Sequence, residues 1–195
     1  FSLPMPAIRA YRFYQDGWVH PEILLKEFER LEALWVETRK DRLLPQQGKA
    51  IITFSDGSAW FELPKSAWED ESNAMAHCGN LHNIGGHEKL LSYRTPEEGK
   101  WRPHLTFVLT NGKLGQRKAY ANTKPSARYS FVIARLFEKV DGFIDGGYRS
   151  KNNFGLDDLS DADKRYLYAH KPRFFDVVRM ADPFLTVNAG AWFSE

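Results

Sequence analysis

Cysteine is nearly absent from this chain, whose 195 residues include only Cys78. One cysteine cannot form an intrachain disulfide, so packing must stabilise the fold, and we expect a protein of a reducing compartment. An excess of one charge is also lacking, because 27 Lys and Arg face 25 Asp and Glu. The net charge is therefore too small for an overall electrostatic attraction to nucleic acid or to a membrane surface. No apolar run approaches the roughly 20 residues of a spanning helix, so we expect no membrane span.

Aromatic and aliphatic residues, in contrast, are plentiful. Apolar residues make up 43% of the chain and aromatic residues 14%, which supplies a real core and excludes a disordered chain. The length fits one sizeable domain, or a domain with an extension. The first residue is Phe1. Either the terminus is processed or the sequence is a piece of a longer chain, and both options stay open.

The first 49 residues predict an arm followed by an amphipathic helix. Prolines at positions 4 and 6 favour an extended opening. Apolar residues then recur at helical spacing from Pro21 to about Lys40. We assign 1–49 to this N-terminal segment.

Residues 50–141 alternate between strand and helix patterns and predict the core domain. Asp56-Gly57 and Asn111-Gly112 each separate two runs of period two, which is a strong hairpin signal because these turns need positive φ. A capping-box pattern at Ser66 predicts a helix over about 66–78, and an apolar stripe predicts another over 124–140.

The predicted fold class is therefore α+β: an antiparallel sheet of about five strands packed against three main helices. The helices are expected near 21–40, 66–78 and 124–140. Residues 142–195 form a C-terminal extension that packs on the core or on a partner, with a short helix beginning at Ser160.

The densest polar cluster runs from His77 to His87. Four residues in it can bind a metal: His77, Cys78, His82 and His87. Zinc needs about four converging ligands, but adjacent helical residues diverge by about 100°. Loop histidines in solvent and a packed thiol explain the cluster better, so no cofactor is predicted and zinc is a minor alternative.

A second interpretation makes Cys78 a nucleophile. His104 would be its base, oriented by Gln116 or Asn122, in the order typical of cysteine hydrolases. The carboxyl end of a helix, however, disfavours a thiolate. A buried structural cysteine near Trp68 and Met75 is the alternative.

The ribbon around Asn111-Gly112 carries polar groups on both faces. A two-residue turn would place Phe107 opposite Gln116 and Thr106 opposite Arg117. His104, Thr106 and Arg117 would then share one face. Some of these groups must be bonded in the core or line a cleft, and we favour a cleft.

Five basic residues follow this ribbon and the next helix, interleaved with tyrosines. Such residues can bind backbone phosphates and stack on bases. Lysines that protect an exposed sheet edge from pairing with another strand, however, explain most of the pattern. The candidate nucleic-acid contacts are Lys113, Arg117, Lys118, Lys124 and Arg128.

Several short motifs in Trp60–Tyr129 occur in a fixed order. They are Glu-x-x-x-Met-x-His-Cys, Ser-x-Arg, Pro-His-x-Thr and Gln-x-Lys followed by Asn-x-x-Pro. The residues are Trp60, Leu63, Glu71, Met75, His77, Cys78, Ser92, Arg94, Pro103, His104, Thr106, Gln116, Lys118, Asn122 and Pro125. This region resembles an uncharacterised domain of large polyvalent proteins from phages and mobile elements and of PcfJ-like conjugation proteins. Tyr93 and Ala119 depart from the usual Leu and Gly.

The resemblance implies a phage or mobile-element setting, in the cytoplasm of an infected or host bacterium or in the virion. It also implies that the polar residues of the pattern converge on one cleft. As binding residues we name Glu71, His77, Arg94, Thr106, Arg117, Lys118 and Asn122.

Two functional hypotheses follow. The first is a non-enzymatic accessory domain, virion-associated or part of a larger polyprotein, that binds phage or host protein or nucleic acid. The second is an acyl- or group-transfer enzyme with Cys78 as nucleophile and His104 as base, acting on host components.

Overall fold

The computed structural model describes residues 42–77, 87–144 and 153–175, together with Arg30. The chain divides into two compact units, residues 1–41 and 42–195, and the second contains almost all that is described. The helix predicted over 21–40 lies outside the described residues.

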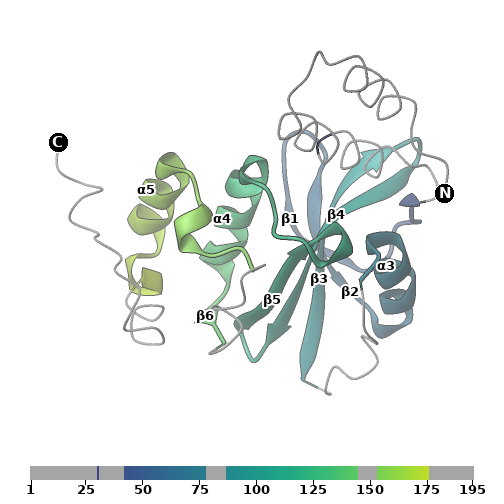
Figure 1. The fold of residues 1–195 in the computed structure, drawn as a ribbon, viewed down its shortest axis with the longest axis horizontal. Helices are drawn as coiled ribbons and strands as arrows, with labels where there is room; N and C mark the ends of the chain where they lie inside the picture. The colour runs from purple at the N-terminus through teal and green to yellow at the C-terminus, as the bar shows by residue number, and fades with distance from the viewer. Residues whose placement is uncertain (1–29, 31–41, 78–86, 145–152, 176–195) are drawn as a thin grey trace, which may run out of the picture. The chain divides into compact units, whose positions relative to one another are not determined.

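The described elements form an α+β fold with a mixed sheet of six strands (Figure 1). The strands are β1 (Lys49–Thr53), β2 (Ala59–Leu63), β3 (Glu88–Glu97), β4 (Lys100–Thr110), β5 (Lys113–Ala119) and β6 (Gly142–Phe143). The α-helices are α3 (Trp68–Met75), α4 (Ser130–Lys139) and α5 (Asp161–His170). Short 3-10 turns are η2 (Lys65–Ala67), η4 (Tyr120–Asn122), η5 (Ala127–Tyr129) and η6 (Leu156–Asp158).

The sheet order is the chain order, β1 to β6. The first five strands are antiparallel, and β6 adds to β5 in parallel. Both predicted hairpins are confirmed, with Gly57 at φ 82 and Gly112 at φ 80. A third hairpin, at Glu98-Gly99, joins β3 to β4. This hairpin is not among the sequence predictions. Pro96 lies within β3 and Pro103 within β4, and proline is uncommon in strand interiors.

The two predicted helices of the core are confirmed, but their starts differ. α4 begins at Ser130 rather than near 124, after the 3-10 turn η5. α3 begins at Trp68 and ends at Met75, and the next residue, Ala76, has a left-handed φ of 49. Ser66 does not cap α3, because Ala67 occupies the position before its first turn. Ser160, in contrast, does cap α5, since its side chain accepts a hydrogen bond from the Asp163 backbone.

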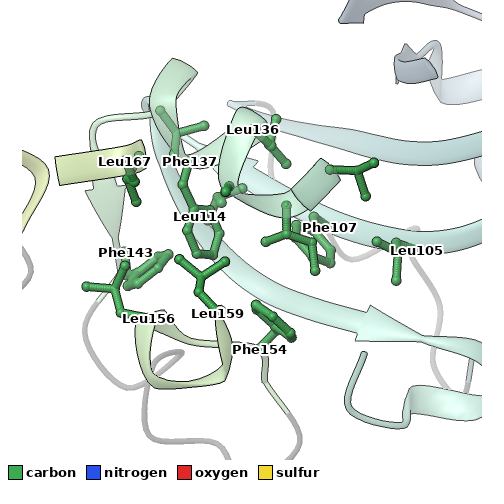
Figure 2. Packing of buried hydrophobic residues seen from close by; sticks show 14 of the residues in the cluster. Leu105, Phe107, Leu114, Leu136, Phe137, Phe143, Phe154, Leu156, Leu159 and Leu167 are labelled. Atoms are coloured by element: carbon green, nitrogen blue, oxygen red, sulfur yellow. The ribbon is translucent and has the colours of Figure 1, made fainter. Parts of the chain in front are cut away.

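One face of the sheet carries the main apolar core. Alternation places Trp60, Tyr93 and Leu105 side by side across β2, β3 and β4. The Trp60 indole donates to the Val132 carbonyl at 2.9 Å and so ties α4 to this face. Figure 2 shows Phe107 and Leu114 of the sheet among side chains of α4 and of residues 153–175. Residues 153–175 therefore belong to the same core as the sheet.

The other face packs against α3. Phe61, Leu63 and Leu90 contribute to a smaller apolar cluster with Trp68. A polar row also crosses this face: the row that continues from Phe61 across the sheet reads Ser92, Thr106 and Lys118.

Candidate functional site

A closed polar network lies between α3 and the sheet. Glu71, in the first turn of α3, accepts from Arg94 Nη2 through Oε2 at 2.6 Å and from Thr106 Oγ1 through Oε1 at 2.8 Å. Arg94 Nε donates to Ser92 Oγ at 3.0 Å. Glu71, Arg94 and Ser92 are 0% exposed and Thr106 is 3% exposed, so the network is sealed from solvent in the chain as described.

The local sequence explains why these side chains meet. Trp68, Glu71 and Met75 share one helical face, and all three are buried against the sheet. Ser92 and Thr106 are register partners on neighbouring strands. A carboxylate at this helical position therefore lies over two hydroxyl-bearing strand positions. Glu71, Arg94 and Thr106 do converge, but among the described residues they form a buried network and not the cleft that the sequence predicted.

Arg94 retains one nitrogen whose donors are unused. Its Nη1 atom is buried and has no hydrogen-bond partner among the described residues. A buried guanidinium nitrogen without an acceptor costs about 1–3 kcal/mol, and more if charged. Each of the two N–H groups on this nitrogen can therefore donate to a further acceptor.

Arg42 joins the far end of α3 to β4. Its Nε donates to the Ala74 carbonyl at 2.7 Å, and its Nη2 donates to the Pro103 carbonyl at 3.1 Å. The Glu71 charge acts on this guanidinium, although burial is the main influence and lowers the Arg42 pKa. Arg42 is not among the predicted site residues, because it lies next to a stretch with no clear periodicity and nothing in the sequence indicates its role.

His77 lies just beyond the end of α3 and is half-buried. Its Nε2 is 3.2 Å from the Ala119 carbonyl of β5. Burial lowers the His77 pKa, and the hydrogen bond to Ala119 and the charge of Glu71 partly offset this. His77 therefore lies within electrostatic reach of the network formed by Glu71.

Two β-bulges overturn the predicted faces of the ribbon. Leu109 pairs with Leu114, but Phe107 pairs with Arg117, so Thr106 lies opposite Lys118 and not opposite Arg117. The extra residue in β5 rotates Arg117 to the face that carries Phe107. Between β3 and β4, Tyr93 pairs with Leu105 and Arg94 with Pro103, which leaves His104 as the extra residue. The prediction that His104, Thr106 and Arg117 share one face is wrong.

His104 instead contacts aromatic residues next to the main core. Its Nε2 is 2.9 Å from Thr95 Oγ1, and its Nδ1 is 3.0 Å from the Tyr129 hydroxyl. Its ring packs 6.0 Å from Tyr93 and 5.8 Å from Tyr129, measured between centroids. Burial, followed by the charges of Arg42 and Arg102, lowers the His104 pKa to about 4. The imidazole is therefore neutral near pH 7, with both nitrogens engaged.

Arg117 fastens the chain segment that follows residue 152 to β5. Its Nε donates to the Phe154 carbonyl at 2.5 Å, and its Nη1 donates to the Leu114 carbonyl at 3.1 Å. The guanidinium carbon lies 4.2 Å from the centroid of the Phe143 ring. Arg117 is 0% exposed, so this position serves packing and lies apart from the Glu71 network.

The other predicted site residues are dispersed. Gln116 is exposed on β5, away from the buried row that includes Lys118. Asn122 is half-buried in η4 with a left-handed φ of 58. Lys118 is 8% exposed, and burial lowers its pKa. Of these three, only Lys118 lies in the same strand row as Thr106.

The cysteine-based predictions fall on residues that are not described. Cys78 and His82 lie outside the described residues, so neither the Cys78–His104 pair nor the His77, Cys78, His82 and His87 metal set has a described geometry. His87 is exposed. Within 42–77, 87–144 and 153–175, no three His, Cys, Asp or Glu side chains gather as a metal site.

The predicted basic patch is mostly engaged in contacts within the chain. Lys124 pairs with Asp158, with Nζ 2.5 Å from Oδ1. Arg128 lies over the Tyr129 ring at 4.6 Å and donates to its hydroxyl. Arg117 and Lys118 are buried, which leaves Lys113 as the exposed lysine of β5.

None of the described helices is long and apolar enough to cross a membrane.

Comparison of the chain with family models, with curated proteins and with solved structures gives no match.

Proposed function

We propose that this chain is a non-enzymatic binding domain, used as an accessory part of a phage or mobile-element protein, and that it binds a protein partner on its α3 side. The setting, a host or infected cell or a virion, is supported by the ordered motifs between Trp60 and Tyr129.

The observation that carries the proposal is the network of Glu71, Arg94 and Thr106. These residues come from three elements, α3, β3 and β4, and all belong to the motif set. Replacement of a buried ion pair by apolar residues is often neutral or stabilising, so burial alone does not account for it. An arginine that still has an unused donor supports a role in binding.

A protein partner fits better than a nucleic acid. Backbone phosphates are bound by several exposed cations arranged along a surface. Two of the five predicted cations, Arg117 and Lys118, are buried, and Lys124 is paired with Asp158. The remaining exposed set is too small to follow a nucleic-acid strand.

The enzyme alternative is less well supported by the geometry. A general base needs an imidazole nitrogen within reach of the proton that it removes. Both His104 nitrogens already have partners within the chain, Thr95 and Tyr129. The low His104 pKa, about 4, also makes this imidazole a weak base near pH 7.

The proposal can be tested by selecting peptides from a displayed random library on the immobilised full chain. We expect selected peptides to bind saturably, and His77→Ala to weaken binding about tenfold, a loss of about 1.4 kcal/mol. Tyr168→Ala is the matched control, since Tyr168 is exposed on α5, which packs with α4 rather than with α3.

Three outcomes would contradict the proposal. The first is a failure to select any peptide. The second is salt-dependent retention on single-stranded DNA that is lost on replacing Lys113 and Arg128. The third is turnover of an activated acyl ester that disappears in both Cys78→Ser and His104→Ala.

A further inference from the structure

The sheet ends in two different edges. β6 has two residues, both buried, whereas β1 has five residues, four of which are exposed. Within the described ranges, β1 pairs with β2 on one side and with no strand on the other. Alternate residues of an edge strand direct their backbone N–H and C=O groups away from the sheet. The outer edge of β1 therefore offers a short row of hydrogen-bonding groups to a further strand.

Edge strands usually carry features that prevent such pairing, and in β1 these features are incomplete. Charged side chains, prolines and bulges are the common ones. β1 contains a bulge, since Ile51 is the extra residue between the pairs made by Ala50 and Ile52. It has no charge or proline from Ala50 to Thr53, and Ile51 is 37% exposed. The bulge restricts a partner to a short segment but does not exclude one.

The α4 side of this edge is an incompletely covered part of the main core. Ile52 and Phe54 pack against the core but remain half-buried. The ring centroid of Phe54 lies 5.7 Å from that of Phe131, at the start of α4, and Phe131 is 48% exposed. A strand added outside β1 would direct every second side chain toward these residues. Apolar side chains at those positions would therefore bury more of this surface.

We infer that the outer edge of β1 is a docking site for an extended segment of a protein partner, which adds to the sheet as a further strand. The inference goes beyond the binding proposed on the α3 side, because it assigns a second surface at the edge of the sheet. In this mode of recognition, main-chain hydrogen bonds provide affinity and alternate side chains provide specificity. An extended polypeptide fits this edge because its own N–H and C=O groups repeat at the spacing of a strand.

Lys49 indicates the charge that the partner segment carries. It is exposed at the first position of β1. Its cross-strand neighbour Glu62 forms an ion pair with Lys89, with Nζ 3.0 Å from Oε2. A carboxylate near one end of the added segment would therefore complement Lys49. A second copy of this chain fits less well, because antiparallel pairing about Ile51 would place the uncharged Thr53 opposite Lys49.

The test selects peptides on the immobilised full chain from a displayed octapeptide library. Every second position in the library is Val, Ile or Phe, and the other positions are random. Selected peptides are titrated against the wild type, Ile51→Glu and Tyr168→Glu. Tyr168 is the matched control position, since it is 39% exposed and lies on α5. Each peptide is also made in two N-methylated versions, one with the odd and one with the even amides methylated, so that each version loses the donors of one edge.

We expect selected peptides to bind the wild type saturably and to bind Ile51→Glu at least tenfold more weakly. A charge on an edge strand opposes pairing, and this charge also repels an acidic segment. Tyr168→Glu should bind as the wild type does. One N-methylated version should lose binding and the other should keep it, because only one edge of the peptide faces β1. An acidic residue should be enriched near one end of the selected peptides.

Several results would overturn the inference. They are a failure to select any peptide, equal binding to the wild type and Ile51→Glu, and full binding by both N-methylated versions. Self-association of the wild type that Ile51→Glu abolishes would also overturn it, since a second copy would then be the occupant. The pair of N-methylated peptides decides the question even if Ile51→Glu does not fold.

The two proposals fail separately. Peptides from the unbiased library that are weakened by His77→Ala and not by Ile51→Glu would support binding on the α3 side alone. Peptides with the opposite response would support the β1 edge alone.

Discussion

The two faces of the sheet bury arginines in opposite ways. On the α4 face, Arg117 donates to main-chain carbonyls and lies against the Phe143 ring, as part of an otherwise apolar core. On the α3 face, Arg94 pairs with the carboxylate of Glu71 and keeps an unused nitrogen. Burial of a charge therefore does not by itself identify a site. What distinguishes a candidate site is whether the fold alone satisfies the charged group.

The largest effect is expected from breaking the ion pair. Glu71→Ala leaves a charged guanidinium buried without its carboxylate, and we expect the free energy of unfolding to fall by about 4 kcal/mol. Urea titration followed by circular dichroism measures this change.

A triple variant tests whether the polar network is needed for stability. Glu71→Leu, Arg94→Met and Thr106→Val together should lie within about 1 kcal/mol of the wild type, because apolar replacements can match a buried pair. A triple variant as unstable as Glu71→Ala would mean that the network contributes stability and is not retained for binding.

The second effect concerns the apolar face. Leu136 is 0% exposed in the main core, so Leu136→Ala should cost about 3 kcal/mol through lost burial and a residual cavity. Phe131→Ala on the same helix is the control, since Phe131 is 48% exposed and should cost less than about 1 kcal/mol. Equal losses would show that the assigned burial of α4 is incorrect.

The third effect is a pH dependence from His104, whose pKa is lowered to about 4 from an ordinary 6.5. Between these values the unfolded chain binds more protons than the folded one, so stability rises with pH. From pH 7 to pH 5, His104 alone should reduce the free energy of unfolding by about 2 kcal/mol. His104→Gln should remove this part of the slope, and an unchanged slope would contradict the assignment.

The smallest effect separates two serines that the sequence places at helix starts. Ser160 caps α5 and also donates to Asp163, so Ser160→Ala should cost about 1 kcal/mol. Ser66→Ala should change stability by less than about 0.5 kcal/mol, because Ser66 is exposed and Ala67 precedes α3. Thermal unfolding of both variants measures the difference.

Local turn chemistry made part of the fold predictable. Asp-Gly and Asn-Gly pairs accept positive φ, and both predicted hairpins are present. The apolar stripe of α4 was equally readable, since its burial follows the helical period. Glu98-Gly99 has the same left-handed geometry, but the flanking prolines obscured the two strands that it joins.

The site was only partly predictable. Glu71 could be placed on the buried face of α3 by its spacing from Trp68 and Met75, and its convergence with Arg94 and Thr106 follows from strand alternation. His104 and Arg117 could not be placed correctly. A bulge adds one residue to one strand and reverses the alternation beyond it. Pro103 and Gly115 lie beside the two bulges and are the signal that could have indicated them, because proline and glycine inside a strand are typical of bulges.

By itself, the sequence determined the α+β class, the hairpins that need positive φ, and the helical face that carries Glu71. These features depend on near neighbours in the chain, where side-chain period and backbone sterics act directly. Tertiary structure alone decided that Arg117 fastens Phe154, that His104 contacts Tyr129, and that Arg94 keeps one nitrogen unused. Those outcomes depend on strand register and on partners more than twenty residues away along the chain, and a one-residue shift in register changes every contact.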